Sequence, residues 1–248
     1  HKKGAADAAR GKIFTRHAKL VEIAAREGDS GDPDQNAKLR TAILDAKAEN
    51  VPNANIDRAI KKGTGELKGA AQTVSVIYEA YGPQGSAFII ECLTDNKNRT
   101  LANVKTILGK NGGRFAESGS VMWMFEQKGV IVARHSVTCT SERKAANDQS
   151  STTNNDELEL SLIDAGAEDI NIQDSIIEVT TGREGWGNIR DLLKERGCEL
   201  QTAGLKYVPN QTVEISDEKN ASGVVKLVEL LEEDDDVSEV HTNAELAS

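Results

Sequence analysis

The 248-residue sequence has few of the residues that build common structural and catalytic sites. Its three cysteines, Cys92, Cys139 and Cys198, are widely separated, and no Cys-x-x-Cys pair occurs. This pattern is typical of proteins in a reducing compartment and predicts neither a disulfide framework nor a structural zinc site. The chain begins at His1 without a methionine, so we expect that its natural N-terminus is missing.

Long apolar runs and catalytic motifs are also absent. No run approaches the ~20 apolar residues that cross a bilayer, so we expect a soluble chain with no membrane partner. The sequence contains no Gly-x-Ser-x-Gly, Walker-type, His-Glu-x-x-His or EF-hand motif. His135 and Cys139 lie four residues apart, but two donors in a Ser/Thr-rich stretch do not make a metal site. We therefore expect no enzymatic activity, no cofactor and no bound metal.

Charge is distributed unevenly along the chain. The whole sequence has 30 basic and 40 acidic residues, a net charge of −10. Residues 1–68 contain 14 basic and 10 acidic residues, a net of +4, so the remaining 180 residues have a net of −14. Such asymmetry suggests that the basic part meets a polyanion. The overall pI of about 5.0 argues against a protein that binds DNA with its whole surface.

Residues 2–26, KKGAADAARGKIFTRHAKLVEIAAR, predict an amphipathic helix. At ~100° per residue, an arc of roughly 80° collects the following cations: Lys12, Arg16, Lys19 and Arg26. The opposite side collects Ile13, Phe14, Leu20, Val21 and Ala24. The cations either contact a polyanion or form an ordinary solvated face.

Two further regions add candidate nucleic-acid contacts. Helices expected over 35–50 and from 53 to about 62 contribute more cations to the basic part. The polar stretch 96–99 lies between an apolar strand and a helix start, where N–H groups and cations could receive phosphate; the alternative is a capped turn. The candidate set is Lys2, Lys3, Arg10, Lys12, Arg16, Lys19, Arg26, Arg40, Lys47, Lys61, Lys62, Asn96, Lys97, Asn98 and Arg99.

From Thr73 the apolar period changes to two, which indicates strands. We expect strands over 74–78, 87–93 and 120–126, with a helix ending near residue 110 before the third strand. Trp123 and Phe125 would supply scarce aromatic bulk, since aromatic residues make up only 4% of the chain. Cys92, in an apolar strand, is interpreted as a core residue.

A second module is expected from residue 129. Its predicted helices, 157–165 and 183–196, and its strands, 129–134, 170–172, 176–180 and 200–207, follow the ferredoxin-like order. Segments 210–215, 217–233 and 237–242 would complete the first module. We interpret 136–156 as a flexible loop and Glu232 to Asp236 as a solvated helix end.

The sequence thus predicts an α+β protein with an N-terminal three-helix domain and two ferredoxin-like α+β domains, one inserted in the other. The expected limits are 1–70 for the basic helical domain, 71–127 plus 208–248 for the split domain, and 128–207 for the inserted domain.

Several motifs resemble those of the YebC family. They are KKGAADAARGKIFTR, VPNANIDRAIKKGTGE, YEAYGPQG, ECLTDNKNRT, KNGGRFAESGSVMWMFEQKGVI and DAGAEDI, and the match spans nearly the whole chain. Ala80 and Gln84 depart from the pattern, which usually has glycines there. The family includes the mitochondrial translational activator of cytochrome oxidase subunit one. The resemblance implies three domains, one helical and two α+β, and a non-enzymatic role in gene expression.

The resemblance leaves the nature of that role open. Family members have been labelled DNA-binding transcriptional regulators and, alternatively, ribosome-associated factors that help translation through proline-rich stretches. We favour ribosomal RNA, tRNA or the ribosome as partner, because a modest +4 patch suits a large preformed RNA surface. Promoter DNA is the alternative, and a ligand-sensing or scaffolding role is a further one. We expect a monomer in the cytoplasm, or in the mitochondrion if a transit peptide has been removed before His1.

Overall fold

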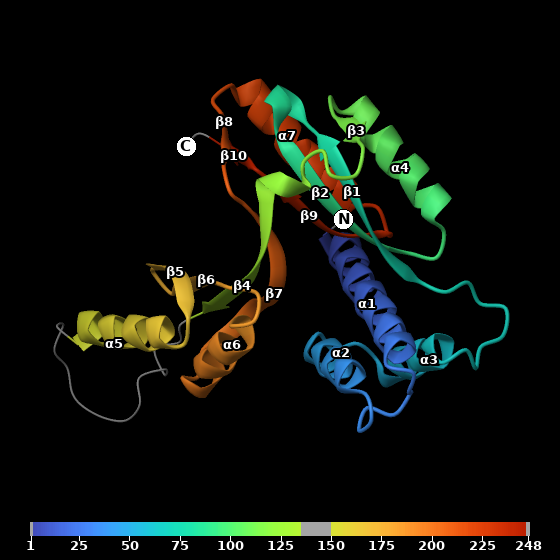
Figure 1. Ribbon diagram of the computed structural model, residues 1–248, viewed down its shortest axis with the longest axis horizontal. Coiled ribbons are helices and arrows are strands. Elements are labelled where there is room, and N and C mark those ends of the chain that lie inside the picture. The colour runs from blue at the N-terminus through green and yellow to red at the C-terminus, as the bar shows by residue number, and fades with distance from the viewer. Residues whose placement is uncertain (1, 135–149, 247–248) are drawn as a thin grey trace. The chain divides into compact units, whose positions relative to one another are not determined.

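The computed structural model describes residues 2–134 and 150–246, with side chains over 10–134 and 156–246. Residue contacts divide the chain into two units. The first runs to Trp123 and resumes at Thr212, and the second spans Met124–Gln211. Helices precede antiparallel sheets in the chain, which confirms the predicted α+β class (Figure 1).

The first unit begins with a bundle of three helices, α1 (Lys2–Glu27), α2 (Ala37–Ala48) and α3 (Asn53–Gly63) (Figure 1). Asn36 caps α2 because its side chain accepts a hydrogen bond from the Leu39 amide at 3.0 Å. A Cβ atom on Gly63 would lie 2.3 Å from the carbonyl oxygen of Glu22, so a glycine is needed where α3 approaches α1. The buried core of the bundle consists of Val21, Ala24, Ala25, Leu39, Ala46, Val51, Ile56 and Ala59.

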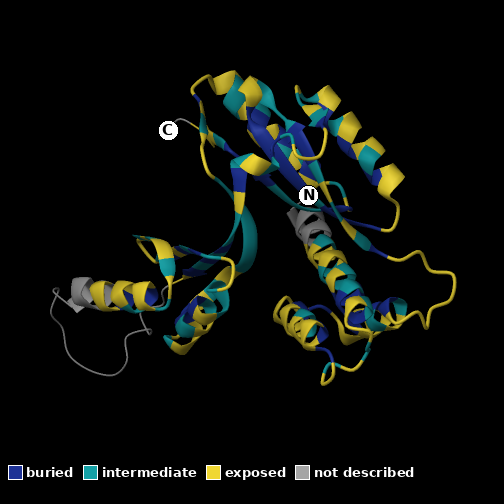
Figure 2. Ribbon diagram, viewed as in Figure 1, coloured by how far each residue is buried: buried dark blue, intermediate teal, exposed yellow. Residues whose placement is uncertain are grey.

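The same unit contains a four-stranded antiparallel sheet in the order β3-β1-β2-β9. Its strands are β1 (Val74–Tyr81), β2 (Ala87–Thr94), β3 (Arg114–Ala116) and β9 (Val237–Thr242). Because strand side chains alternate, Phe88, Ile90 and Cys92 share one face of β2. That face shares a core with residues of α4 (Lys97–Lys110) and α7 (Glu218–Glu232). Figure 2 shows β2 as the most deeply buried strand of this sheet.

Cys92 is fully buried, as its sequence context predicts. Burial raises the pKa of its thiol to about 12, so the thiol is protonated at neutral pH. A protonated, inaccessible thiol is a core side chain and not a nucleophile.

The second unit folds around a four-stranded antiparallel sheet in the order β5-β6-β4-β7. Its elements are β4 (Phe125–Arg134), α5 (Ser150–Asp164), β5 (Ala167–Gln173), β6 (Ile176–Thr181), α6 (Trp186–Glu195) and β7 (Glu199–Pro209). This chain order and strand order match the predicted ferredoxin-like module. Leu158, Leu162, Ile189 and Leu193 of the two helices share one core with the sheet.

The strand predicted over 120–126 is wrong. A short 3-10 helix, η2 (Met122–Met124), occupies this position, and β4 begins only at Phe125. The amides of Gly119, Val121 and Met122 donate to the buried carboxylate of Glu79 at 2.6, 2.7 and 2.9 Å, so they are not available to a neighbouring strand. Trp123 is 69% exposed and does not supply core bulk.

Other boundaries also differ from the prediction. β8 (Val213–Ile215) pairs with β10 (Ala244–Leu246) in a separate parallel ladder instead of joining the four-stranded sheet. Because α5 begins at Ser150, residues 150–156 of the predicted loop are helical. The rest of that loop, with His135 and Cys139, lies outside the described residues. The limits 1–70, 71–127 plus 208–248, and 128–207 stay a prediction, since the contacts define only two units.

The turn η1 (Pro83–Gly85) shows where the sequence departs from the family pattern. Gln84 has a φ of 55°, in the left-handed region that favours glycine.

No helix in the described ranges is both long and apolar enough to span a membrane.

We expect Glu79→Gln to destabilise the first unit by roughly 1–3 kcal/mol. Only the oxygen of the glutamine amide can accept a hydrogen bond, so its NH2 group would face at least one backbone N–H without bonding to it. Urea unfolding followed by circular dichroism measures the loss. Glu117→Gln is the matched control, since Glu117 is exposed in the same segment. Equal stabilities for the two variants would show that Glu79 does not hold residues 119–122.

Candidate nucleic-acid interface

The cationic side of α1 does not face only solvent. It meets the acidic segment Glu232–Asp236, which joins α7 to β9 in the same unit. Lys19 illustrates this placement, because its Nζ donates to the carbonyl oxygens of Leu93 and Asp235, both at 2.8 Å, and to Asp236 Oδ1 at 3.0 Å. These three acceptors use all three N–H donors of the ammonium group. Lys19 therefore holds α1 against the sheet and has no donor left for a phosphate.

Asp236 is the centre of this contact, and its residue surface is only 5% exposed. Arg99 donates to Asp236 Oδ2 through Nη2 at 2.6 Å and through Nε at 3.2 Å. The Thr100 hydroxyl donates to the same oxygen at 2.9 Å. Burial of the carboxylate favours its neutral form, but the hydrogen bonds from Arg99, Lys19 and Thr100 outweigh burial, so the pKa of Asp236 lies below its ordinary value. The interpretation of Glu232–Asp236 as a solvated helix end is therefore wrong for Asp236.

Lys12 lies about two helical turns before Lys19 and is also turned inward. Its Nζ is buried and has no hydrogen-bond partner among the described residues. Burial lowers the pKa of Lys12, although the carboxylates of Glu232, Asp235, Asp234 and Glu233 act in the opposite direction. Arg16 is more exposed and makes a long ion pair of 3.5 Å with Glu239. The helical wheel thus grouped these cations on one side of α1 correctly. It did not indicate that an acidic segment of the same chain lies against that side.

A second buried carboxylate joins the helices of the bundle to the first strand. Glu22 accepts from the amide and the hydroxyl of Thr73 at 2.7 and 2.8 Å, and pairs with Lys62 Nζ at 3.0 Å. Arg26 donates to the Thr73 carbonyl oxygen at 2.7 Å. Lys62 and Arg26, both predicted contacts, therefore fix the segment that leads into β1.

A cleft of about 550 Å³ lies within the first unit, beside these two carboxylates. It brings together three predicted site residues that are distant in sequence: Lys19, Lys62 and Arg99. Arg58, which the predicted set lacks, is a fourth cation of the lining and is exposed. The acidic side chains of the lining are Glu22, Asp95 and Asp236. Because Lys19, Lys62 and Arg99 are paired with these acids, Arg58 is the cation of the cleft that makes no described ion pair.

The remaining predicted residues fall into three groups. Asn96 is the N-cap of α4 and accepts from the Arg99 amide at 3.1 Å, so the capped-turn alternative describes its side chain. Lys2 and Lys3 lie in α1, but their side chains are outside the described part of the chain. Within that part, the side chains that are exposed and make no ion pair belong to Arg10, Arg40, Lys47, Lys61, Lys97 and Asn98.

Sequence reasoning missed the carboxylates that organise the site. Glu22 and Asp236 lie 51 and 217 residues from their partners Thr73 and Lys19. No local pattern marks such pairs, and Asp236 ends a run of five acidic residues that looks solvated. Arg58 was visible as part of the basic third helix, but no spacing distinguished it from its neighbours.

We expect Asp236→Asn to lower the free energy of unfolding at pH 7 by about 3 kcal/mol, because it leaves Lys19 and Arg99 facing a neutral amide. Asp235→Asn is the control, since the Asp235 side chain is exposed and the change in charge is the same. Urea titration measures both. Similar losses in the two variants would mean that long-range charge, and not the buried contact, stabilises this turn.

The same carboxylate predicts a dependence on pH. Its pKa is lower in the folded chain than in the unfolded chain, where an Asp has a pKa of about 3.9. The stability it contributes is therefore fully present above that value and is lost as the pH falls through the folded pKa. Between about pH 5 and pH 2 the wild type should lose more stability than Asp236→Asn does. Parallel curves of stability against pH for the two proteins would contradict this assignment.

Comparison with known proteins places these features in a family. The family model described as the TACO1/YebC protein N-terminal domain matches residues 1–66, and the model of the TACO1/YebC second and third domain matches residues 73–244.

Relatives match over nearly the whole chain. A probable transcriptional regulatory protein of Clostridium tetani is 44% identical over 98% of this chain and 92% of its own length. One of the same name from Halothermothrix orenii is 40% identical over 99% of this chain and 91% of its own. The crystal structure of a conserved hypothetical protein from Aquifex aeolicus has a TM-score of 0.80 at 37% identity, and the match covers 98% of this chain and 93% of that one. The chain therefore belongs to the TACO1/YebC family.

Proposed function

We propose that the chain is a non-enzymatic regulator of gene expression that binds folded RNA through its helical bundle. One observation supports this proposal above the others: a net charge of +4 over residues 1–68 of a chain with a net charge of −10. Arg40 and Lys47 on α2, with Arg58 and Lys61 on α3, are exposed and make no ion pair within the described residues. Charged groups without internal partners are free to contact phosphate and to release its counterions.

These helices replace the cationic side of α1 as the expected contact. Lys12, Lys19 and Lys62 are turned toward the interior of the first unit, so their charges are largely committed there. Arg10 and Arg40 are exposed instead. The proposed interface therefore consists of Arg10, Arg40, Lys47, Arg58 and Lys61.

Ribosomal RNA or tRNA suits this distribution better than duplex DNA. The other 180 residues have a net charge of −14, so a polyanion can approach one part of the surface only. A large folded RNA offers a shaped surface on which a small basic patch can be combined with other contacts. Promoter DNA is the second candidate, because the relatives from Clostridium tetani and Halothermothrix orenii are named probable transcriptional regulatory proteins.

Within gene expression, we propose a role as a ribosome-associated factor that relieves stalling at proline-rich stretches. The family resemblance of the motifs supports this role. A binding protein without catalytic chemistry could act there by positioning RNA or tRNA, and the described site contains charged contacts and no recognised catalytic motif.

Charge reversal tests the interface. Arg40→Glu, Lys47→Glu and Lys61→Glu together should weaken binding to purified ribosomal RNA and reduce the slope of log affinity against log salt by about one for each lost phosphate contact. Filter binding across a salt series measures both. The control is Lys194→Glu, Lys219→Glu and Lys226→Glu, which makes the same change in net charge at exposed lysines outside the bundle. An equal effect of the two triple variants would rule out a specific role for the bundle.

An experiment in cells distinguishes a role in translation from a role in transcription. In a bacterium that lacks its own family member, expression of this chain should lower ribosome occupancy at proline-rich codon runs and leave the transcript levels of those genes nearly unchanged. The bundle variant should not lower it, although circular dichroism should show that it is folded. Paired ribosome profiling and RNA sequencing measure both quantities. Promoter-specific changes in transcripts, with equal pausing in both strains, would favour the DNA-binding alternative.

A further inference from the structure

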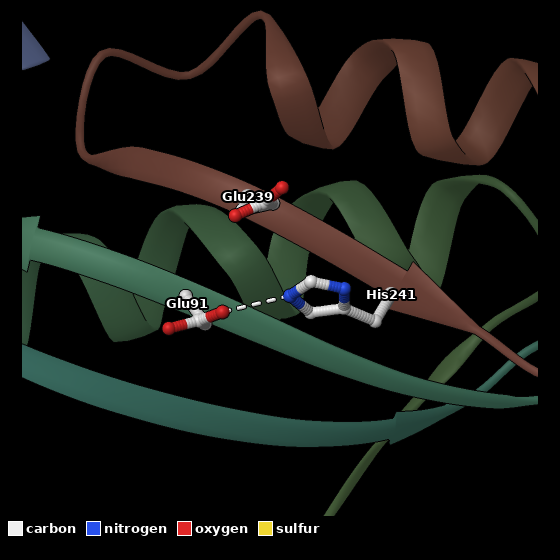
Figure 3. A group of neighbouring side chains, drawn as sticks. All are labelled: Glu91, Glu239 and His241. Atoms are coloured by element: carbon white, nitrogen blue, oxygen red, sulfur yellow. Dashed lines mark hydrogen bonds and ion pairs between the residues drawn. The ribbon is translucent and has the colours of Figure 1, made fainter. Parts of the chain in front are cut away.

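Three potential metal ligands lie together on the first sheet, on the face opposite α4 and α7. They are Glu91 of β2 and Glu239 and His241 of β9 (Figure 3). Glu91 and Glu239 are direct partners in the antiparallel register, and His241 lies two residues beyond Glu239 on the same side of the strand. One ligand atom from each residue lies within 4.8 Å of the other two. The pairing of rigid strands therefore brings one imidazole and two carboxylates to a common point.

The charges of this cluster favour a cation. Two carboxylates directly opposite each other on neighbouring strands repel. Arg16 makes an ion pair with Glu239 at 3.5 Å, and because its side chain is 45% exposed, solvent screens this pair. His241 Nε2 lies 2.7 Å from Glu91 Oε1, which directs the ring nitrogen toward the carboxylates. A divalent ion between the three groups would be attracted by both glutamates at once and would reduce their repulsion.

We propose that Glu91, Glu239 and His241 bind a divalent transition-metal ion, with Zn²⁺ as the best fit. Imidazole nitrogen and carboxylate oxygen are both good zinc ligands, whereas Mg²⁺ and Ca²⁺ prefer oxygen alone. Three protein ligands leave a fourth position for water. The Glu91 and Glu239 side chains are 26% and 21% exposed, so an ion can reach them, while His241, at 7%, is held in place by its surroundings.

Only small movements are required. Ligand bonds of about 2.0–2.2 Å in a tetrahedral site place neighbouring ligand atoms roughly 3.3 Å apart. The distance between His241 Nε2 and Glu91 Oε1 would increase from 2.7 Å. Ligand atoms that now lie farther apart than 3.3 Å, and at most 4.8 Å, would move closer together. Rotation of the glutamate side chains can produce both changes without moving the strands. His241 must bind through a deprotonated Nε2, so the hydrogen bond to Glu91 is replaced by two bonds to the metal.

Zinc titration of the full chain tests the site. After treatment with EDTA and its removal, the wild type is titrated with ZnSO₄ in an isothermal calorimeter at pH 7.5. One zinc ion per chain should bind. Glu239→Gln and His241→Gln should each weaken its binding by at least about tenfold, since each removes one of three ligands. The controls are His17→Gln and Glu214→Gln, which remove the same types of group elsewhere on the first unit, and His135→Gln, four residues before Cys139 in the sequence. All three should bind zinc like the wild type.

Two outcomes would overturn the proposal. One is a dissociation constant of the wild type for Zn²⁺ larger than about 1 mM. The other is tight Zn²⁺ binding that Glu239→Gln and His241→Gln leave unchanged. If circular dichroism shows that either variant is unfolded, Glu91→Gln takes its place, because its amide can still form a hydrogen bond with His241. Co²⁺ added to the wild type gives an independent readout. Visible absorption bands of a four- or five-coordinate site should appear and be lost on addition of one equivalent of Zn²⁺; absence of these bands would count against the site.

Discussion

Asp236 accepts hydrogen bonds from α1, from the start of α4 and from the end of β2, and much of the first unit depends on this convergence. A buried carboxylate is costly unless its charge is compensated. Here two cations and two hydroxyl groups compensate it, and Lys19 extends the contact to two carbonyl oxygens. Directional polar bonds therefore hold the bundle against the sheet.

This use of charge changes how a basic helix in an acidic chain should be interpreted. A cationic side that looks like a nucleic-acid contact can instead neutralise the chain's own acidic segment. In α1 the side chains of Lys12 and Lys19 do so, and the buried Nζ of Lys12 shows how far a lysine can be withdrawn from solvent. In the described part of the bundle, exposed cations outside such pairing include Arg40 and Lys47 on α2 and Lys61 on α3. The surface that we propose as the RNA contact consists of cations that remain exposed after this internal pairing.

Local signals predicted local structure well. The three N-terminal helices, the buried strand around Cys92 and the ferredoxin-like second unit followed from periodicity and from turn residues. Periodicity assigns a side chain to a face, but it does not say what covers that face, so the burial of Lys12 and Asp236 could not be predicted. No local pattern indicates that the carboxylate of Glu79 accepts hydrogen bonds from the amides of residues 119, 121 and 122, which prevents a strand there. Likewise, His241 and Glu91 are 150 residues apart, and only the pairing of β2 with β9 brings them together.

The distance between Lys19 and Asp236 along the chain also affects the order of events during synthesis. The two residues are separated by 217 positions, so α1 leaves the ribosome long before its acidic partner exists. At 5–20 residues per second, the delay is roughly 10–40 s. During that interval the second unit can complete its own sheet, since all of its strands lie between residues 124 and 211. Until then the Nζ of Lys19 lacks the carboxylate of Asp236, and the contact is completed only when the segment between α7 and β9 has been made.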